Sequence, residues 1–265
     1  MTLPLASQGT RLSADGSPSG SDRPAPRGLA WSVTSYALIA LLAGAAWVCF
    51  FVLNRTRVRR TGRVAGPWGN TLFVSNHQST VDTLLVGLAT CHPRCWLEPR
   101  LLPWSVAAAE VYFRTRVTAW FADHLRCISV RRDRPDPTAL LRVVRALPGG
   151  TAIYFPEGRR SRSGAIGEAS PAAGWIALRT GARVIPVAID GMNEAVRFDR
   201  FDVRCFRRIG VSVGPELDLS AYRDREPSRA AAREVTNLMM AAIEREHVNA
   251  RAARGDGNDR ERTGS

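Results

Sequence analysis

His77 has a carboxylate five residues downstream, in the stretch Asn76-His77-Gln78-Ser79-Thr80-Val81-Asp82. An imidazole paired with a carboxylate can act as a general base, because the carboxylate holds the proton of one ring nitrogen while the other nitrogen accepts a proton from a hydroxyl group. Five residues along an ideal helix turn by about 500°, which would point the two side chains about 140° apart. The pair therefore requires that His77 precede a helix and that Asp82 lie in its first turn.

The flanking sequence supports this arrangement. Residues 71–75 are apolar and predict a strand, and the apolar run 83–89 predicts a helix. The hydroxyl residues between them can cap the start of that helix. A second interpretation stays open: Ser79-x-x-Asp82 has the spacing of a capping box, with His77 as a polar loop residue.

A second polar cluster follows the predicted strand 151–155. Residues 156–164 form a turn with three arginines, in which Glu157 and Gly158 stand beside the basic residues and indicate an ordered loop. Open α/β sheets bind ligands at the ends of their strands, and guanidinium groups suit phosphate. The loop is interpreted as an anion site; the alternative is a solvated basic loop.

These predicted strands and helices together indicate an α/β fold, a mixed sheet flanked by helices. Further strands are predicted at 127–130, 183–189 and within 204–213, and further helices at 137–147, 170–180 and from 228. Residues 96–122 are apolar and aromatic and are interpreted as helical. Pro186 argues that its strand is an edge strand or ends irregularly.

The N-terminal part has a different character. Residues 1–27 are rich in Ser, Gly and Pro and are predicted to be disordered. No charged residue occurs over the 23 positions 31–53, and a helix of that length rises about 34 Å, enough to cross a bilayer core. We predict a membrane helix over 28–54. A helix that dips into one leaflet and a buried core helix are the alternatives.

Basic residues around this segment are distributed unequally. Arg23 and Arg27 lie shortly before it, and five arginines follow at once: Arg55, Arg57, Arg59, Arg60 and Arg63. This bias predicts that the C-terminal side lies in the cytoplasm, with a collar that favours anionic lipid. The expected organisation is a main domain over 55–250 at the inner face of the cell membrane and a disordered tail over 251–265.

Composition narrows the chemistry. The net charge is +13 and the chain has no lysine, which excludes Schiff-base chemistry and a P-loop lysine. The basic excess fits an anionic membrane or a phosphorylated substrate, whereas no nucleic-acid-binding motif is present and no such partner is expected. Five cysteines, an odd number, predict free thiols. Cys91 to Cys95 lacks the second cluster that a four-ligand zinc site needs, so no metal is expected.

Four blocks carry a family resemblance. The stretch 76–82 resembles the N-H-x-x-x-x-D motif of the 1-acyl-sn-glycerol-3-phosphate acyltransferase family. Residues 155–161 resemble its F-P-E-G-T-R-S block, with Arg159 where threonine is usual. Residues 128–132 resemble the strand that ends in the second-motif arginine, which would be Arg132, and 184–189 resemble the V-P-V-x-I block. The four blocks occur in the family's order over about residues 70–190.

This resemblance implies that the chain transfers a fatty acyl group from acyl-CoA or acyl carrier protein to a lysophospholipid at a membrane, giving phosphatidic acid without a cofactor. His77 would be the general base and Asp82 its orienting partner. The acceptor phosphate would be bound by residues of the second and third blocks: Arg132, Glu157, Gly158, Arg159 and Arg160.

Other functions stay open at this point. Within the same chemistry the acceptor could be another lyso-lipid, including one without a phosphate, and Ser79 could be a nucleophile. With water as acceptor the same pair would give a thioesterase. The alternative of a different class is a non-catalytic protein that binds anionic membranes through its arginines.

Overall fold

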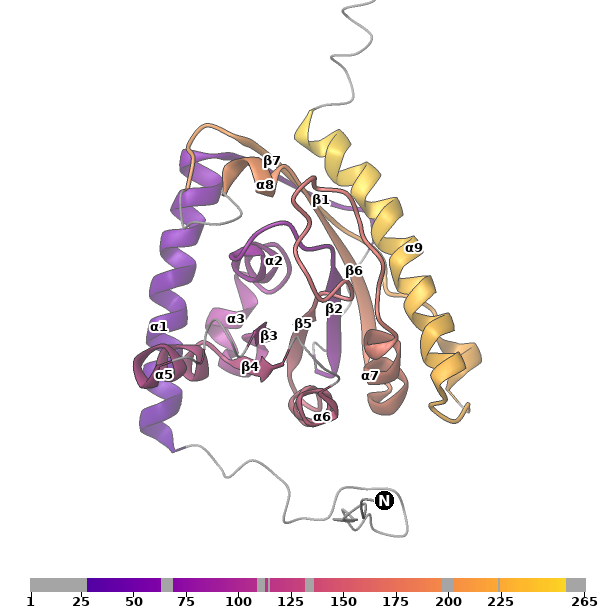
Figure 1. Cartoon of the computed structure of the whole chain (residues 1–265). Coiled ribbons are helices and arrows are strands. Elements are labelled where there is room, and N and C mark those ends of the chain that lie inside the picture. The colour runs from indigo at the N-terminus through magenta and orange to yellow at the C-terminus, as the bar shows by residue number, and fades with distance from the viewer. Residues whose placement is uncertain are drawn as a thin grey trace, which may run out of the picture.

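The computed structural model describes residues 28–62, 69–108, 113, 115–131, 136–196, 203–223 and 225–255. Within them a seven-stranded mixed sheet lies between two layers of helices (Figure 1), which confirms the predicted α/β fold. The strands are β1 (Arg55–Arg60), β2 (Thr71–Ser75), β3 (Trp104–Ala108), β4 (Cys127–Val130), β5 (Thr151–Tyr154), β6 (Arg183–Asp190) and β7 (Arg208–Val213).

The strand order is β1-β7-β6-β2-β5-β3-β4. From β6 to β4 every neighbouring pair is parallel, and β7 runs antiparallel to β6 and parallel to β1. The carboxyl ends of β2, β5, β3, β4 and β6 therefore meet at one edge of the sheet, where ligands bind in open α/β folds.

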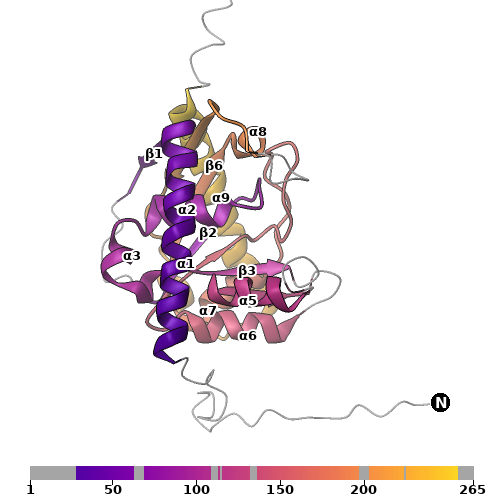
Figure 2. The ribbon, with the colours of Figure 1, turned by 90° about the vertical axis from the view of Figure 1, so that its left-hand side faces the viewer.

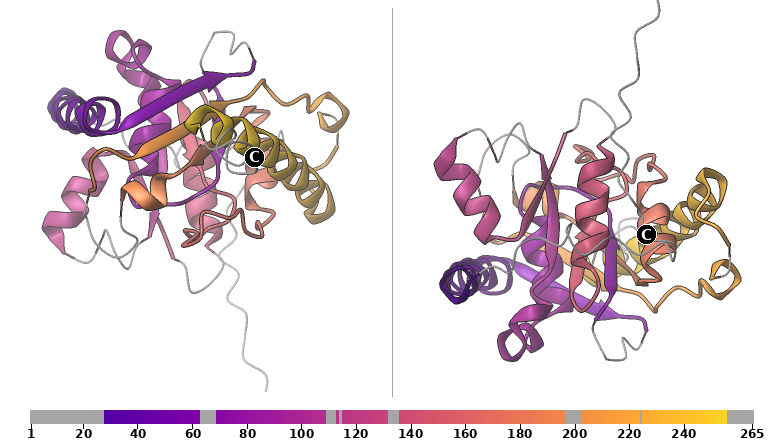
Figure 3. Two further views of the ribbon diagram at one scale, coloured as in Figure 1. Left: turned by 90° about the horizontal axis from the view of Figure 1, so that it is seen from above. Right: turned by 90° about the horizontal axis from the view of Figure 1, so that it is seen from below.

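Helices cover both faces of the sheet (Figures 1 and 3). One face carries α1 (Leu29–Trp47), α2 (Asp82–Thr90), α3 (Arg94–Leu97) and α8 (Met192–Ala195), with α5 (Arg116–His124) beside α1; the other carries α6 (Pro137–Ala146), α7 (Ala172–Thr180) and α9 (Arg229–Arg254). Three short helical turns complete the elements: Val48–Leu53, Pro99–Leu101 and Ser220–Tyr222. Each face buries its own apolar cluster, centred on Phe73 and Leu85 on the α1 side and on Ile176 and Met239 on the α9 side.

The predicted N-terminal helix is present, and it packs along the domain (Figure 2). Helix α1 runs straight into the π-helical turn Val48–Leu53, and the combined 25-residue helix has the length and hydropathy of a membrane span. One face is covered: Ala46 and Phe50 are buried in the core, and Trp31 donates from Nε1 to Asp123 Oδ2 at 2.7 Å. The opposite face is apolar and exposed, at Leu29, Val33, Leu41, Val48 and Val52.

Several predicted elements are confirmed, and two interpretations were wrong. Residues 96–122 are not wholly helical, because β3 lies among them and pairs with β4 and β5. The arginine-rich stretch 55–60, for which the sequence predicted no secondary structure, is strand β1, since it pairs with β7. Pro186 is not on an edge strand, because β6 lies between β2 and β7. The antiparallel pairing with β7 begins one residue later, at Val187, and Pro186 itself accepts a bond from Gly214 N–H at 2.9 Å.

Close packing of α7 on α9 generates a stability prediction. At Gly174 a Cβ would lie 2.0 Å from the Ala232 carbonyl oxygen and 2.8 Å from Thr236 Oγ1, which already accepts the Gly174 N–H. We expect Gly174→Ala to lower the free energy of unfolding by about 1–3 kcal/mol, the usual cost of overpacking. Thermal unfolding in detergent measures it. Gly44→Ala on α1, where a Cβ meets nothing within 4 Å, is the matched control and should leave the transition unchanged or raise it.

Candidate active site

The two predicted polar clusters follow neighbouring strands. Strand β2 pairs in parallel with β5, so the segment after Ser75 and the loop after Tyr154 emerge side by side at the same edge of the sheet. The first segment carries His77 and Asp82, and the second carries Glu157 to Arg160. The sheet thus brings together residues about 80 positions apart in the sequence.

His77 and Asp82 are in contact. The imidazole Nδ1 lies 2.9 Å from Asp82 Oδ2, and Asp82 is the first residue of α2, as the spacing required. The Asp82 side chain is 0% exposed and that of His77 is 14% exposed. With Asp82 as acceptor, the neutral ring carries its proton on Nδ1 and leaves Nε2 unprotonated.

The Asp82 carboxylate also organises the turn before α2. Its Oδ2 accepts the N–H groups of Gln78 at 2.6 Å and Ser79 at 2.8 Å, and Oδ1 accepts the Ser79 hydroxyl at 2.6 Å. The capping-box interpretation is wrong, because α2 begins at Asp82 with Val81 as its N-cap and has no side-chain cap bond. The carboxylate instead holds the turn before the helix and the imidazole together. Ser79 is fully buried and donates to Asp82.

Residues after β5 fix the backbone and the ring of His77. The Phe155 ring stacks on the imidazole, with centroids 4.1 Å apart and planes at 14°. The His77 N–H donates to Glu157 Oε1 at 3.1 Å, and its carbonyl accepts the N–H of Ser161 at 2.7 Å. The two strand ends are thus linked through the main chain of His77.

Glu157 and Gly158 shape the arginine loop. Glu157 accepts the His77 N–H and, at 2.8 Å, the N–H of Gly167. Burial raises the pKa of the Glu157 carboxyl, and these backbone hydrogen bonds oppose the rise. Gly158 has a φ of 65° and donates its N–H to the Phe155 carbonyl at 3.0 Å, a left-handed turn that glycine adopts without strain.

The predicted arginines lie in different environments. Arg160 is half-buried and lines the cavity described below, whereas Arg159 is exposed on the same loop. Arg132 lies outside the described residues. The structure thus places Arg160 on the same cavity as His77, leaves Arg159 exposed one residue before it, and does not assign the position of Arg132.

Sequence reasoning gave no role to two neighbours of His77 that tie it to β6. Asn76 exchanges two hydrogen bonds with the backbone of Ile189, at 2.8 and 2.9 Å. Gln78 donates to the Ile189 carbonyl at 3.0 Å and accepts the N–H of Met192 at 3.0 Å. Both residues have buried amide side chains and lie within the motif itself. Their position directly after a predicted strand was the sequence feature that could have indicated a structural role.

The next residue of β6 extends these ties to the last helix. Asp190 lies 3.2 Å from His247 Nε2 and 3.1 Å from Arg254 Nη1, both on α9. Burial alone would raise the pKa of Asp190, but the hydrogen bonds and positive charges of these two partners hold it below the ordinary value. The strand end beside the site is therefore fixed to the far layer of helices.

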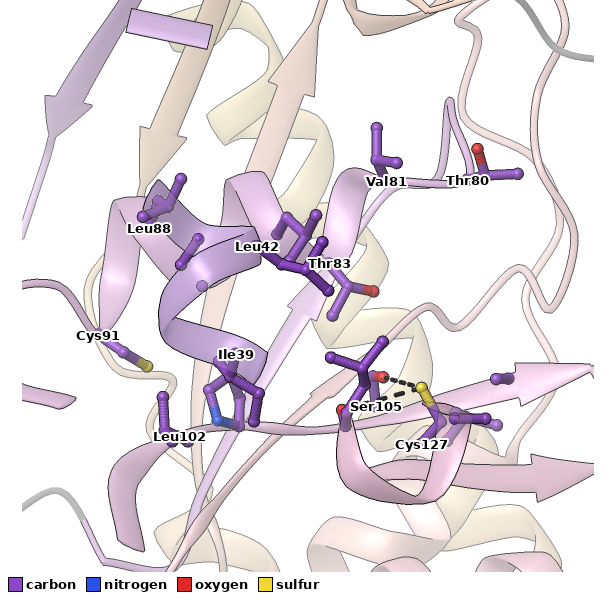
Figure 4. A pocket seen from close by; sticks show the side chains of 18 of the residues that line it. Ile39, Leu42, Thr80, Val81, Thr83, Leu88, Cys91, Leu102, Ser105 and Cys127 are labelled. Atoms are coloured by element: carbon purple, nitrogen blue, oxygen red, sulfur yellow. Dashed lines mark hydrogen bonds between the residues drawn. The ribbon is translucent and has the colours of Figure 1, made fainter. Parts of the chain in front are cut away.

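A cavity of about 530 Å³ opens beside His77. Its walls come from α1, α2, α3, α5 and β3, and most are apolar (Figure 4). Figure 4 shows Ile39 and Leu42 of α1, Leu88 of α2 with Cys91 just after that helix, and Ser105 beside Cys127 at the sheet. His77, Phe155 and Arg160 line the same cavity, so an imidazole and a guanidinium group lie at the border of a mostly apolar space.

The thiols around this cavity are weak nucleophiles. Burial raises the pKa of Cys91 to about 12 and also raises the pKa values of Cys95 and Cys127, which keeps these groups protonated at neutral pH. All five cysteines are free. In the part of the chain that the structure describes, no three His, Cys, Asp or Glu residues are placed to share a metal ion.

Known proteins resemble the chain in sequence and in fold. The 1-acyl-sn-glycerol-3-phosphate acyltransferase of Escherichia coli is 22% identical over 192 residues, which cover 71% of this chain and 74% of that protein. The Salmonella typhimurium protein of the same name is 24% identical over 159 residues, 60% and 61% of the two lengths. The crystal structure of the 1-acyl-sn-glycerophosphate (LPA) acyltransferase PlsC from Thermotoga maritima matches with a TM-score of 0.56 and 22% identity, covering 79% of this chain and 78% of that one.

A family model described as Acyltransferase matches residues 52–190. This range includes the His77–Asp82 pair, the arginine loop and strand β6, and it spans 139 of the 265 residues, more than half of the chain. The chain belongs to the Acyltransferase family.

Proposed function

We propose that this acyltransferase moves a fatty acyl group from a thioester of coenzyme A or acyl carrier protein to the free hydroxyl of 1-acyl-glycerol-3-phosphate, giving phosphatidic acid. The observation that carries this proposal is the set of residues around one cavity. The apolar cavity of about 530 Å³ is lined by His77, whose ring is oriented by Asp82, and by Arg160. Those are the groups that a hydroxyl, a phosphate and a fatty chain require.

The chemistry follows from the orientation of His77. With Nδ1–H held by Asp82, Nε2 takes the proton of the acceptor hydroxyl as its oxygen attacks the thioester carbonyl. A tetrahedral oxyanion forms and collapses, the C–S bond breaks, and the leaving thiolate takes the proton from the imidazolium. Asp82 stabilises that transient imidazolium. No covalent enzyme intermediate is required.

The surroundings of Ser79 support direct transfer rather than a serine nucleophile. Its hydroxyl is fully buried and points to Asp82, with 2.6 Å between Ser79 Oγ and Asp82 Oδ1. A nucleophile would need its hydroxyl within reach of the base. We therefore assign Ser79 to holding Asp82.

The arginine loop supplies the acceptor site in this proposal. Arg160 borders the cavity beside His77, and Arg159 is exposed next to it, so both guanidinium groups can approach a phosphate. Glu157 and Gly158 contribute by shaping the loop, because the Glu157 carboxylate is already used by His77 and Gly167. Arg132 completes the set that the sequence motifs predict.

The apolar cavity takes the donor's acyl chain. Its volume lies within the range of pockets that enclose whole small molecules. The walls offer Leu42, Leu88 and Phe121, among other apolar side chains, and the raised pKa values of the cavity thiols keep those groups neutral. A hydrocarbon chain can fill such a space without burying an unpaired charge.

We further propose that α1 lies in the plane of one leaflet. It touches the domain along its whole length: Trp31 binds Asp123, Tyr36 donates to the Trp96 carbonyl at 3.1 Å, and Phe50 is buried. A helix that crossed the bilayer upright would drag the attached domain into hydrocarbon, where irregular polar backbone is excluded. A helix lying flat places only its bare face in lipid.

The cytoplasmic face of the cell membrane is the proposed location. The five free thiols support it, because thiols stay reduced in the cytoplasm, and the arginines after α1 suit an anionic lipid surface. Radiolabelled acyl-CoA or acyl carrier protein, offered to the purified protein with lysophosphatidate, tests the activity directly. Labelled free fatty acid formed without a lyso-lipid would instead indicate a thioesterase.

Removing the base should abolish transfer. We expect His77→Ala to lower kcat about 10²–10⁴-fold, the usual contribution of a positioned base, and Asp82→Asn to lower it strongly because the favoured tautomer is lost. Steady-state rates with a fixed acyl donor measure both. Asp218→Asn, an exposed loop carboxylate, is the control and should keep full activity.

Ser79→Ala separates the two mechanisms in the same assay. Direct transfer predicts a loss of about tenfold or less, because Asp82 keeps three of its four hydrogen bonds. A loss as complete as that of His77→Ala, or a trapped acyl-enzyme, would show that Ser79 is the nucleophile.

Arg160→Gln tests the phosphate site. We expect KM for lysophosphatidate to rise about 10–100-fold, the worth of a charge-assisted hydrogen bond, with little change for a monoacylglycerol that has no phosphate. Initial rates over a range of acceptor concentrations measure the difference. Arg162→Gln removes the same charge from the same loop at an exposed position and should change KM by less than about threefold. Equal losses with both acceptors would contradict the assignment.

Gly87→Leu tests the chain pocket. Gly87 lies on α2 at the cavity wall, and an added Cβ would meet only Pro103 Cγ at 3.6 Å, so the new side chain extends into the cavity. We expect activity with an eighteen-carbon donor to fall at least about tenfold more than with a twelve-carbon donor, because overfilling costs about 1–3 kcal/mol. A uniform loss across donors would place the chain elsewhere.

A further inference from the structure

Residues 203–207 form a turn, here called the Phe206 turn, that is bonded to the end of the N-terminal helix. The N–H of Phe206 donates to the Leu53 carbonyl at 2.8 Å, the N–H of Arg207 donates to Asn54 Oδ1 at 2.8 Å, and the N–H of Arg55 donates to the Arg207 carbonyl at 2.8 Å. Asn54 is itself buried and donates to the Cys49 carbonyl at 2.9 Å. The turn is therefore fixed relative to α1 (Figure 1, the orange segment beside the upper end of α1).

Phe206 has an unfavourable backbone conformation in this turn. Its φ is 62°, a left-handed value that is unfavourable for a bulky side chain. Its side chain is 81% exposed, so packing within the described chain does not repay that cost. A rigid turn that presents an aromatic ring to solvent is characteristic of a contact surface.

The Phe206 turn is bonded to the C-terminal end of the N-terminal helix, where the bare face of that helix ends. Val48 and Val52 are exposed on that face at its C-terminal end, and Val203 is exposed in the turn. The Trp47 and Phe51 rings stack nearby on the helix, 6.2 Å apart. The apolar surface thus continues from the helix onto the turn.

We propose that the Phe206 turn is a second membrane-contact element, which inserts Phe206 into the interfacial layer of an anionic bilayer at the C-terminal end of α1. The inference rests on the in-plane placement of α1 under the proposed function. A helix lying flat can roll about its own axis, and a ring beside its end opposes that rotation. Phe206 would set which side of the domain faces the lipid.

Two arginines give the contact its lipid preference. Arg204 and Arg207 are exposed and flank Phe206 in the turn. A guanidinium group at this level meets the phosphates of the headgroups, and each basic residue near an anionic surface contributes about fivefold in affinity. The partner that fits is therefore a bilayer rich in anionic lipid such as phosphatidylglycerol.

Vesicle co-sedimentation of the full chain tests the proposal, with phosphatidylcholine vesicles that contain or lack phosphatidylglycerol. We expect Phe206→Gly to weaken binding about tenfold through loss of the buried ring, while its melting temperature stays or rises because glycine relieves the positive φ. Phe206→Trp should retain binding. Val248→Ala removes a side chain that is 71% exposed on α9, in the opposite layer, and should bind as the unaltered chain does.

The remaining outcomes separate the alternatives. The double variant Arg204→Gln/Arg207→Gln should lower the preference for phosphatidylglycerol by up to about 25-fold, two contributions of about fivefold each, and keep its binding to phosphatidylcholine. If the unaltered chain binds vesicles and Phe206→Gly binds them equally well, the turn is not a membrane contact. The proposal for the turn then fails, and the proposed function is unaffected. If the unaltered chain binds no vesicles, the membrane placement fails as well. A change of mass in detergent on Phe206→Gly, without a change in vesicle binding, would instead identify a self-association surface.

Discussion

The structure of the site depends on one buried carboxylate. Asp82 is fully removed from solvent, yet it accepts four hydrogen bonds, two from backbone N–H groups, one from Ser79 and one from His77. Burying a charge without such donors would cost several kcal/mol, so the turn from β2 into α2 and the ionised acid require each other. The imidazole gains its orientation from a group that the fold already needs.

A second constraint joins this turn to the arginine loop. Both main-chain groups of His77 are used by residues after β5, its N–H by Glu157 and its carbonyl by Ser161. The distance between the imidazole of His77 and the arginine loop is therefore fixed, because the main chain of His77 is hydrogen-bonded to that loop on both sides. Asn76 and Gln78 add the tie to β6, and Asp190 passes it to α9. The last helix thus supports, from the other side of the sheet, the edge that carries His77 and Asp82.

Much of this could be predicted from local pattern. Helix geometry set the condition for a contact of His77 with Asp82, a histidine before the helix and an acid within its first turn, but it left the capping-box alternative open. The glycine and arginines of residues 156–164 could be assigned to a loop because they directly follow the apolar strand 151–155. Strand β1 escaped notice because its arginines read as a charged collar, and the pairing with β7 that makes it a strand lies about 150 residues away. Strand β3 was hidden in an aromatic run without alternation. Pro186 misled because proline is unfavourable only where its missing N–H is needed, and β6 meets β7 after that residue.

The position of α1 has a thermodynamic consequence. Ile39, Leu42 and Ala43 face the cavity, while the other side of the same helix is bare and apolar. Under the proposed function that side lies in lipid and the cavity takes the donor's tail. A fatty tail passing from bilayer to enzyme would then leave one hydrocarbon-like medium for another, and the free energy of moving each methylene would be close to zero. Longer tails then gain almost nothing by binding. Donors would then be distinguished by whether their tail is too long for the cavity. Their affinity would come from the polar head group, which stays in water.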